Sequence, residues 1–453
     1  MVFDITKPSS ERHTSQVLFN HGPATVSHSF DEDNLISPTG LVPIMRLAAQ
    51  AGLTDLAANR LSVSKTAGDK GANPAAKLAT LIAGMIAGAD SIDDMDQLRH
   101  QGMKKLFDRV CAPSTLGSFL RSFAFGHVRQ LDAISSRLLT NLDRMTPLGS
   151  RGLNALIATA STPQSGQVSV GQRLRKGSTY SARGADKFVS DTLAATTRMP
   201  TLGQSVLLRA DSAYYSSSVA KAADRAGADI SITVRMDQKI KAAIASISDD
   251  AWTGIEYPQA IWDDDAGAWI STAEVAEIDY TAFSSKKQAL HIPGRLIVRR
   301  VPELNENKRG PGQAGLFEIC RYHAFFTTVG AEVLDTVAAD KVHRRHAIIE
   351  QIHAGLKNGP LGHMPSGVFN ANAAWLTIAA MTHNLLRAVA GLVGGAMARV
   401  RAPTLRARII TVPARIAHRA RKLVLHLPTG WAWQSEFDRL WAASLGPPAT
   451  ITA

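Results

Sequence analysis

The chain of 453 residues has little cysteine and no long apolar run. Its two cysteines, Cys111 and Cys320, cannot build a disulfide framework or a four-cysteine zinc site, so they fit a reducing compartment. The best apolar stretches, 78–89 and 388–398, are shorter than the ~20 residues that a membrane-spanning helix needs. No apolar segment of a secretory signal is visible near the first residue. We therefore expect a cytoplasmic protein with no membrane partner.

The chain also lacks several short motifs of common enzymes. It contains no Walker A pattern, no H-E-x-x-H and no C-x-x-C, which disfavours nucleotide hydrolysis and a zinc site. Acidic residues are outnumbered, because 50 Lys and Arg stand against 38 Asp and Glu, for a net charge of +12. A positive surplus favours a polyanionic partner such as nucleic acid, although it also serves plain solubility.

The apolar periodicity changes along the chain. Up to about residue 140 it is helical, with a turn at Gly52 that resembles a helix-turn-helix but also suits ordinary packed helices. From 152 to 235, strand and helix patterns alternate, as in an α/β domain. Residues 250–330 are rich in predicted strands, and predicted helices follow at 337–356 and 372–390.

Two acidic residues are candidates for chemistry. Asp211 ends a predicted buried strand, where ligands of α/β sheets usually bind; alternatively it caps the helix that follows. Glu350 shares one predicted helix face with His343, His346 and Lys357, at spacings of three, four and seven residues. Such a face suits a carboxylate that holds a metal while cationic groups grip phosphates; alternatively it is a solvated face on which Glu350 pairs with a neighbouring charge.

Two basic segments are candidates for DNA backbone contact. Arg173, Arg175 and Lys176 form a basic turn after a predicted strand, which is alternatively an ordinary exposed turn. Residues 399–422 carry eight Arg and Lys with no acid and with interleaved apolar residues. This pattern predicts amphipathic helices whose basic face contacts phosphates or is simply solvated.

Blocks along nearly the whole chain resemble the DDE transposases of bacterial insertion sequences, in particular the group named insertion sequence thirteen-eighty. The blocks are FDRVCAPSTLGSFLRSFAFGHVRQLDA at 107–133, GLNALIATASTP at 152–163, LRKGSTYSARGA at 174–185, VLLRADSAYYS at 206–216, HAIIEQIHAGLKNGPLGHMPSGVFNANAAWL at 346–376 and LVLHLPTGWAW at 423–433. The resemblance implies an α+β multidomain fold. Its parts would be a helical N-terminal DNA-binding region (33–146), an RNase H-like core (150–240 and 333–390), a β-rich insertion (241–332) and a basic helical C-terminal region (391–453).

The resemblance also implies the chemistry. In this superfamily three carboxylates hold two Mg²⁺ or Mn²⁺ ions about 3.5–4 Å apart, and these ions cleave and transfer DNA strands. Asp211 would be the second catalytic and metal-binding acid and Glu350 the third. Lys357, and less firmly His343 and His346, would contact DNA. The partners would be double-stranded transposon ends with terminal inverted repeats, target DNA, and a second copy in a homodimer on DNA.

One departure from the family bears on activity. The first catalytic Asp of the family lies on the first strand of the core, but here LLTNLDRMTPLG runs directly into SRGLNALIATAS. Asp143 is at a predicted helix end, and Asp186 and Asp191 begin or lie on another helix. We therefore expect an internal deletion near residues 147–152, a core that lacks its first strand, and a catalytically inactive copy. The alternative function is that of a non-catalytic DNA-binding remnant of a transposase.

Overall fold

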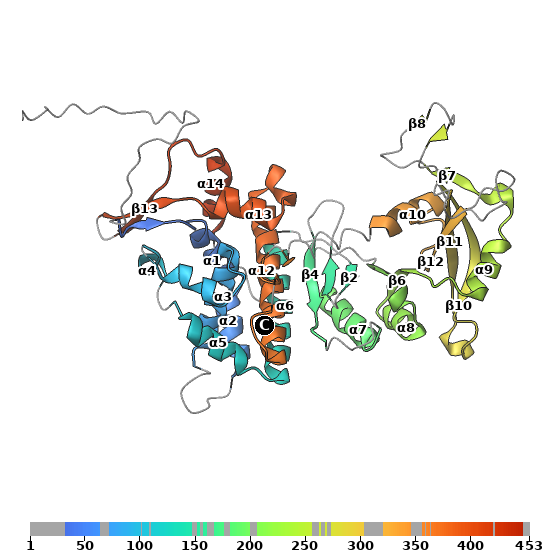
Figure 1. Cartoon of the computed structure of the whole chain (residues 1–453), viewed down its shortest axis with the longest axis horizontal. Coiled ribbons are helices and arrows are strands. Elements are labelled where there is room, and N and C mark those ends of the chain that lie inside the picture. Colours follow the sequence, from blue (N-terminus) through green and yellow to red (C-terminus); the bar gives the residue numbers. More distant parts are fainter. Residues whose placement is uncertain are drawn as a thin grey trace, which may run out of the picture.

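The computed structural model places helices of the two ends of the chain on one side, a large sheet on the other, and a small sheet between them (Figure 1). The described residues are 32–63, 72–100, 102–107, 110–146, 152–154, 157–160, 167–175, 182–199, 206–255, 262–263, 268–269, 273–302, 320–345, 356–357, 359–362, 364–419 and 422–446. The arrangement is mixed α and β, in agreement with the predicted α+β class.

The N-terminal part is helical, as predicted. Gly52 separates the first two helices in a left-handed conformation (φ 83°), and Pro74 opens the third. Within the helical pattern that runs to about residue 140, residues 122–124 separate α5 from α6. The helices are α1 (Leu41–Gln50), α2 (Leu53–Arg60), α3 (Pro74–Ala87), α4 (Met103–Leu106), α5 (Pro113–Arg121) and α6 (Phe125–Met145), with a 3₁₀ segment at Asp93–Arg99.

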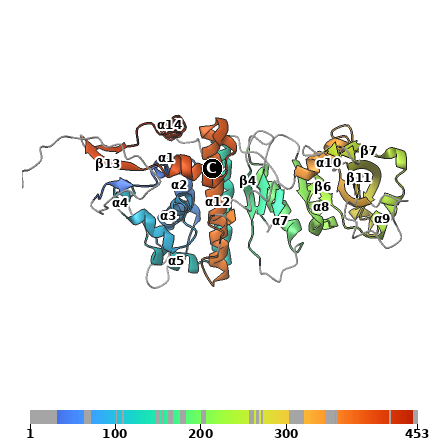
Figure 2. The same cartoon turned by 45° about the horizontal axis from the view of Figure 1, so that its top comes forward.

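The helix α12 (Phe369–Val393) is the central element of the molecule. It lies beside α6 in both views, between the N-terminal helices and the small sheet (Figures 1 and 2). Its length and mean hydropathy of 1.3 would allow it to cross a membrane, but 78% of that apolar window is buried inside the protein. Within the described part of the chain, α12 therefore has the character of a core helix.

The small sheet is an antiparallel meander in the order β2-β3-β4. The alternating stretch that begins at residue 152 opens with β2 (Gly152–Asn154) and β3 (Ile157–Ala160), which pair with each other. The third strand is β4 (Val168–Gln172), followed by the predicted helix α7 (Ala185–Thr196). The backbone of β4 is tied to α12, because the side chain of Asn384 accepts from Ser169 N at 2.7 Å and donates to Ser169 O at 2.6 Å.

The large sheet has six strands in the order β5-β6-β12-β11-β10-β7. Its first two strands are parallel, and the strands of the predicted β-rich stretch 241–332 join them through antiparallel pairing of β12 with β6. This stretch therefore extends the core sheet instead of forming a sheet of its own. The elements are β5 (Val206–Ala210), α8 (Ser217–Arg225), β6 (Ala228–Thr233), α9 (Gln238–Ala245), β7 (Thr253–Ile255), β10 (Ala273–Ala282), β11 (Ile292–Pro302), β12 (Cys320–Thr327) and α10 (Thr336–Arg344), with β8 (Trp262–Asp263) and β9 (Ala268–Trp269) as a separate pair.

The two sheets are neighbours without being joined. The strand β2 lies against β5, but among the described strands β5 pairs only with β6 and β2 only with β3. The strand β2 has three residues and can form few hydrogen bonds with a neighbouring strand. The strands β2 and β5 are therefore edge strands of their two sheets.

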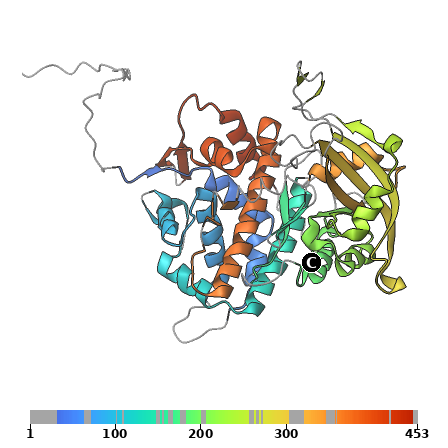
Figure 3. The same cartoon turned by 45° about the vertical axis from the view of Figure 1, so that its right-hand side comes forward.

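The C-terminal region is not the all-helical segment that the sequence predicted. After α13 (Ala402–Leu405) and a π-helical turn at Arg406–Ile410, the chain forms a hairpin of β13 (Ala414–Arg419) and β14 (Lys422–His426). The hairpin pairs with β1 (Leu35–Ile36), so the two ends of the described chain share one sheet (Figure 3). The last helix, α14 (Gln434–Ala443), packs on α1 and α12. The prediction of a helix over 414–422 was wrong. Buried and exposed residues alternate along β13, which is the pattern of a half-buried strand, whereas the sequence pattern predicts that its basic residues occupy one face of a helix.

We expect the stability of the protein to depend on pH because of a buried histidine on the core helix α12. Burial lowers the pKa of His383 on α12 to about 4, and its Nε2 lies 3.0 Å from the carbonyl oxygen of Gln167. Because the folded state binds fewer protons than the unfolded chain, whose His has a pKa near 6.5, stability falls as the pH drops from about 6.5 towards 4. The free energy of unfolding should decrease by about 1–2 kcal/mol between pH 7 and pH 5 through this residue.

Urea unfolding of the wild type and of His383→Gln at both pH values tests this. Glutamine keeps a donor for the Gln167 carbonyl but does not titrate in this range. The variant should lose about 1–2 kcal/mol less than the wild type on acidification. An identical pH response of the two proteins would contradict the assignment.

Candidate active site

Asp211 lies where β5 ends, with an extended backbone (φ −79°, ψ 175°). Its Oδ1 accepts the backbone N–H of Ala213 at 2.8 Å and so caps the 3₁₀ turn Ser212–Tyr214. The capping role that the sequence left open is therefore present. It does not use up the carboxylate, because an ionised Asp has two oxygens and several acceptor positions. The side chain is half-buried at the edge of the large sheet.

Asp211 lies on the same face of the sheet as the helix that leads to Glu350. Side chains alternate along a strand, so Asp211 shares its face with Arg209, two residues earlier. Arg209 is buried and donates from Nη1 to the carbonyl oxygen of Val342 on α10 at 2.7 Å. Its neighbour in register is Ser231 of β6, which also contacts α10. The carboxyl end of α10 is thus held two residues from Asp211.

His343 attaches α10 to this face. Its ring stacks on Phe325 of β12 at 4.0 Å between centroids, and its Nδ1 and Nε2 lie 2.8 Å and 3.1 Å from the hydroxyls of Ser231 and Thr233. Both ring nitrogens are therefore engaged within the protein. The structure gives His343 a role in positioning α10, a role that its spacing from Glu350 did not reveal.

The basic turn after β4 divides into two parts. The guanidinium of Arg175 interacts with Tyr214, three residues after Asp211, and donates to the carbonyl oxygen of Arg183 at 3.4 Å. Burial raises the pKa of Tyr214, the charge of Asp211 raises it further, and Arg175 opposes both. Arg173 instead pairs with Asp191 of α7 at 2.9 Å and lies over the ring of Phe188. Arg175 therefore belongs to the surroundings of Asp211, whereas Arg173 is held against α7.

Three of the predicted site residues, Lys176, His346 and Glu350, lie outside the described residues. Lys357 is described and exposed, next to the buried Leu356, whose carbonyl oxygen accepts from the N–H groups of Gly359 and Leu361. The structure thus brings Asp211, Arg175 and the end of α10 together. The approach of Glu350 to Asp211 stays a prediction.

The described residues do not fit a pair of divalent ions. No group of three or more His, Cys, Asp or Glu side chains that could share a metal ion occurs among them. The sequence from 145 to 185, which includes β2, β3 and β4, contains no Asp or Glu at all. The strand that lies against β5 therefore supplies no carboxylate to face Asp211, and Mg²⁺ and Mn²⁺ prefer oxygen ligands.

Two arginines of the basic C-terminal segment 399–422 make contacts within the protein. Arg406 donates to the carbonyl oxygens of Ile86 and Met85 at 3.0 Å each, which caps the carboxyl end of α3. Arg408 lies 5.0 Å above the ring of Trp433. These two arginines are therefore not available as a continuous phosphate-binding face, which the unbroken run of positive charge had suggested.

Comparison with known proteins relates the chain to a family. The sequence model of the family described as transposase DDE domain group 1 matches residues 163–445, well over half of the chain. The match begins after β3, and it takes in β4, Asp211, α10 and position 350. A search of curated proteins returned no match.

Proposed function

Because the chain belongs to the transposase DDE domain group 1 family, we propose that it derives from the transposase of a bacterial insertion sequence. In this proposal the protein recognises the terminal inverted repeats of the element as double-stranded DNA. Intact members would cleave and transfer strands with Mg²⁺ or Mn²⁺ held by three carboxylates. This copy retains Asp211 and Glu350 as the second and third of these acids and has lost the first.

The observation that carries the proposal is the hydrogen bond from Arg209 to the carbonyl oxygen of Val342. It fixes α10 on the face of the sheet to which Asp211 belongs, and Glu350 follows α10 by six residues. With α10 held on that face, the six residues that follow it in sequence would let the Glu350 carboxylate approach a ligand shared with Asp211. Arg175 and the exposed Lys357 would add positive charge for DNA phosphates.

The missing acid argues against cleavage. Two carboxylates supply fewer ligand oxygens and less negative charge than two divalent ions need, so the affinity for a second ion falls. The strand β2 lies against β5 without pairing with it, and no Asp or Glu occurs between 145 and 185. Both observations support an internal deletion near 147–152 that removed most of the strand with the first acid. We therefore favour the non-catalytic function, a DNA-binding remnant that competes with intact copies for transposon ends. We also propose that it binds these ends as a homodimer.

A supercoiled plasmid that carries the inverted repeats flanking the gene tests the proposal. With Mn²⁺ present, the purified protein should bind a labelled repeat duplex but nick the plasmid no faster than Glu350→Gln. The Gln variant is the matched control because it keeps the side-chain size and removes the charge. Robust strand transfer that depends on Glu350 would contradict the loss of activity, and failure to bind the repeats in preference to a scrambled duplex would contradict end recognition.

A further inference from the structure

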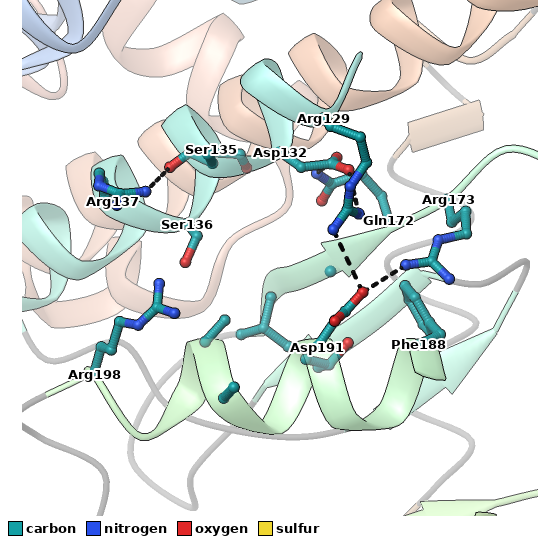
Figure 4. A pocket seen from close by; sticks show the side chains of 16 residues that line it. Arg129, Asp132, Ser135, Ser136, Arg137, Gln172, Arg173, Phe188, Asp191 and Arg198 are labelled. Atoms are coloured by element: carbon teal, nitrogen blue, oxygen red, sulfur yellow. Dashed lines mark hydrogen bonds and ion pairs between the residues drawn. The ribbon is translucent and has the colours of Figure 1, made fainter. Parts of the chain in front are cut away.

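A cavity of ≈ 280 Å³ lies between α6, β4 and α7 (Figure 4), and Asp211 is not among the described residues that line it. We call it the α6–α7 cavity. It joins the helical N-terminal region, which supplies α6, to the core, which supplies β4 and α7. Its two ends differ in charge, and this difference suggests a ligand.

At one end of the α6–α7 cavity the charges are paired within the protein. Asp191 contacts Arg173 at 2.9 Å and Arg129 at 3.5 Å, and Asp132 contacts Arg129 at 3.1 Å and Gln172 at 3.3 Å. Figure 4 shows this network around Asp191. Both acidic residues that line the cavity belong to this network. The arginines at this end therefore already have acidic partners.

At the other end, positive charges gather without an acid among the described lining residues. Arg137 of α6 and Arg198, just beyond α7, both line it. Burial lowers the pKa of Arg137, and the like charges of Arg60 and Arg198 lower it further. The Arg137 guanidinium donates from Nη1 to the carbonyl oxygen of Ala133 at 3.2 Å. An anion placed here would relieve the repulsion among the three guanidinium groups.

Two hydroxyl groups in the same cavity lack partners. Ser136 Oγ and Thr192 Oγ1 are buried and have no hydrogen-bond partner among the described residues. Thr192 is 8% exposed, and Figure 4 shows the Ser136 hydroxyl facing Arg198 across the cavity. An unsatisfied buried hydroxyl costs about 1–3 kcal/mol, so two in one cavity point to an absent hydrogen-bond acceptor. Gly171 lets the Thr192 hydroxyl lie close to β4, since a Cβ there would lie 2.6 Å from Thr192 Oγ1.

We propose that this end of the α6–α7 cavity, formed by Arg137, Arg198 and Ser136 with Arg60 nearby, binds a phosphate group of a DNA backbone. A phosphate offers several acceptor oxygens to hydroxyl donors and takes bidentate hydrogen bonds from arginine. The identification of DNA as its source rests on the proposed function. Backbone phosphate contacts fix the position of a protein on a duplex without reading its sequence, so this site would hold DNA where the helical region meets the core.

The first arm of the test uses inorganic phosphate. Thermal unfolding of the full chain is compared in sodium phosphate and in sodium chloride of equal ionic strength. Phosphate at ten times its Kd should raise the unfolding temperature by about 2 °C, and Arg198→Ala and Ser136→Ala should each abolish this rise. Without phosphate, Ser136→Ala should be as stable as the wild type or more so, because it removes an unsatisfied hydroxyl. A phosphate effect that persists in both variants would overturn the site.

The second arm uses a labelled repeat duplex at several salt concentrations. Arg198→Ala should weaken binding about tenfold and reduce the slope of log K against log salt by about one. The control is Arg225→Ala, an exposed arginine on α8, which should change neither value. Loss of the phosphate effect with unchanged duplex binding would overturn DNA as the source and leave a site for free phosphate. Absence of any duplex binding by the wild type would refute the proposed function. The thermal unfolding in phosphate would still show whether this end of the cavity binds phosphate.

Discussion

Replacing Trp375 by alanine is expected to lower the free energy of unfolding by about 4 kcal/mol. The indole is fully buried on α12, and its Nε1–H donates to the carbonyl oxygen of Pro360. Truncation removes a large buried apolar area, leaves a cavity and deprives that carbonyl of its donor. Urea unfolding followed by circular dichroism measures the loss.

Trp375→Phe separates the two contributions. Phenylalanine keeps most of the ring but cannot donate, so this variant should lose about 1–2 kcal/mol, less than half of the alanine effect. The bond to Pro360 holds the 359–362 loop just after Lys357, so the same variant should also make that loop more open to proteolysis. A loss below 1 kcal/mol for the alanine variant would show that α12 does not pack as described.

Asn384→Leu is expected to cost about 3 kcal/mol. The amide of Asn384 satisfies both the N–H and the carbonyl oxygen of Ser169 on β4, and all of these groups are buried. Leucine has a similar volume but no polar atom, so two backbone groups would lose their partners in a site that excludes water. Denaturant unfolding with near-ultraviolet circular dichroism reports this loss.

A second asparagine on α12 provides the control. Asn372 bonds to the backbone of Ser366 at 3.1 Å and 2.7 Å, but it is only partly buried, so water can replace these bonds. Asn372→Leu should therefore cost about 1 kcal/mol. Equal losses of unfolding free energy in the two variants would show that the buried hydrogen bonds between α12 and β4 stabilise the fold no more than partly exposed ones.

Local signals explain which parts of the fold the sequence could predict. Gly52 ends α1, Pro74 opens α3, and Gly227, with a positive φ of 68°, follows α8, all as the residue types predict. These signals act over a few residues and do not depend on the rest of the chain. The same reasoning correctly located the end of β5 at Asp211.

Other features depend on contacts between distant segments. The pairing of β2 with β3 at the start of the alternating stretch is not encoded in the apolar pattern. The pairing of β1 with β13 joins residues nearly four hundred positions apart. Around Asp211, the contacts of Arg209 with α10 and of Arg175 with Tyr214 are also long-range. The only local hint of Arg209 was its position two residues before an acid on a buried strand.

The central claim is that Asp211 and Glu350 share a ligand site from which a third acid is missing. Titration of the protein with Mn²⁺, followed by electron paramagnetic resonance of the free ion, tests this most directly. The account predicts at most one weakly bound ion per chain, lost in both Asp211→Asn and Glu350→Gln. Two tightly bound ions, or one that neither substitution displaces, would contradict it.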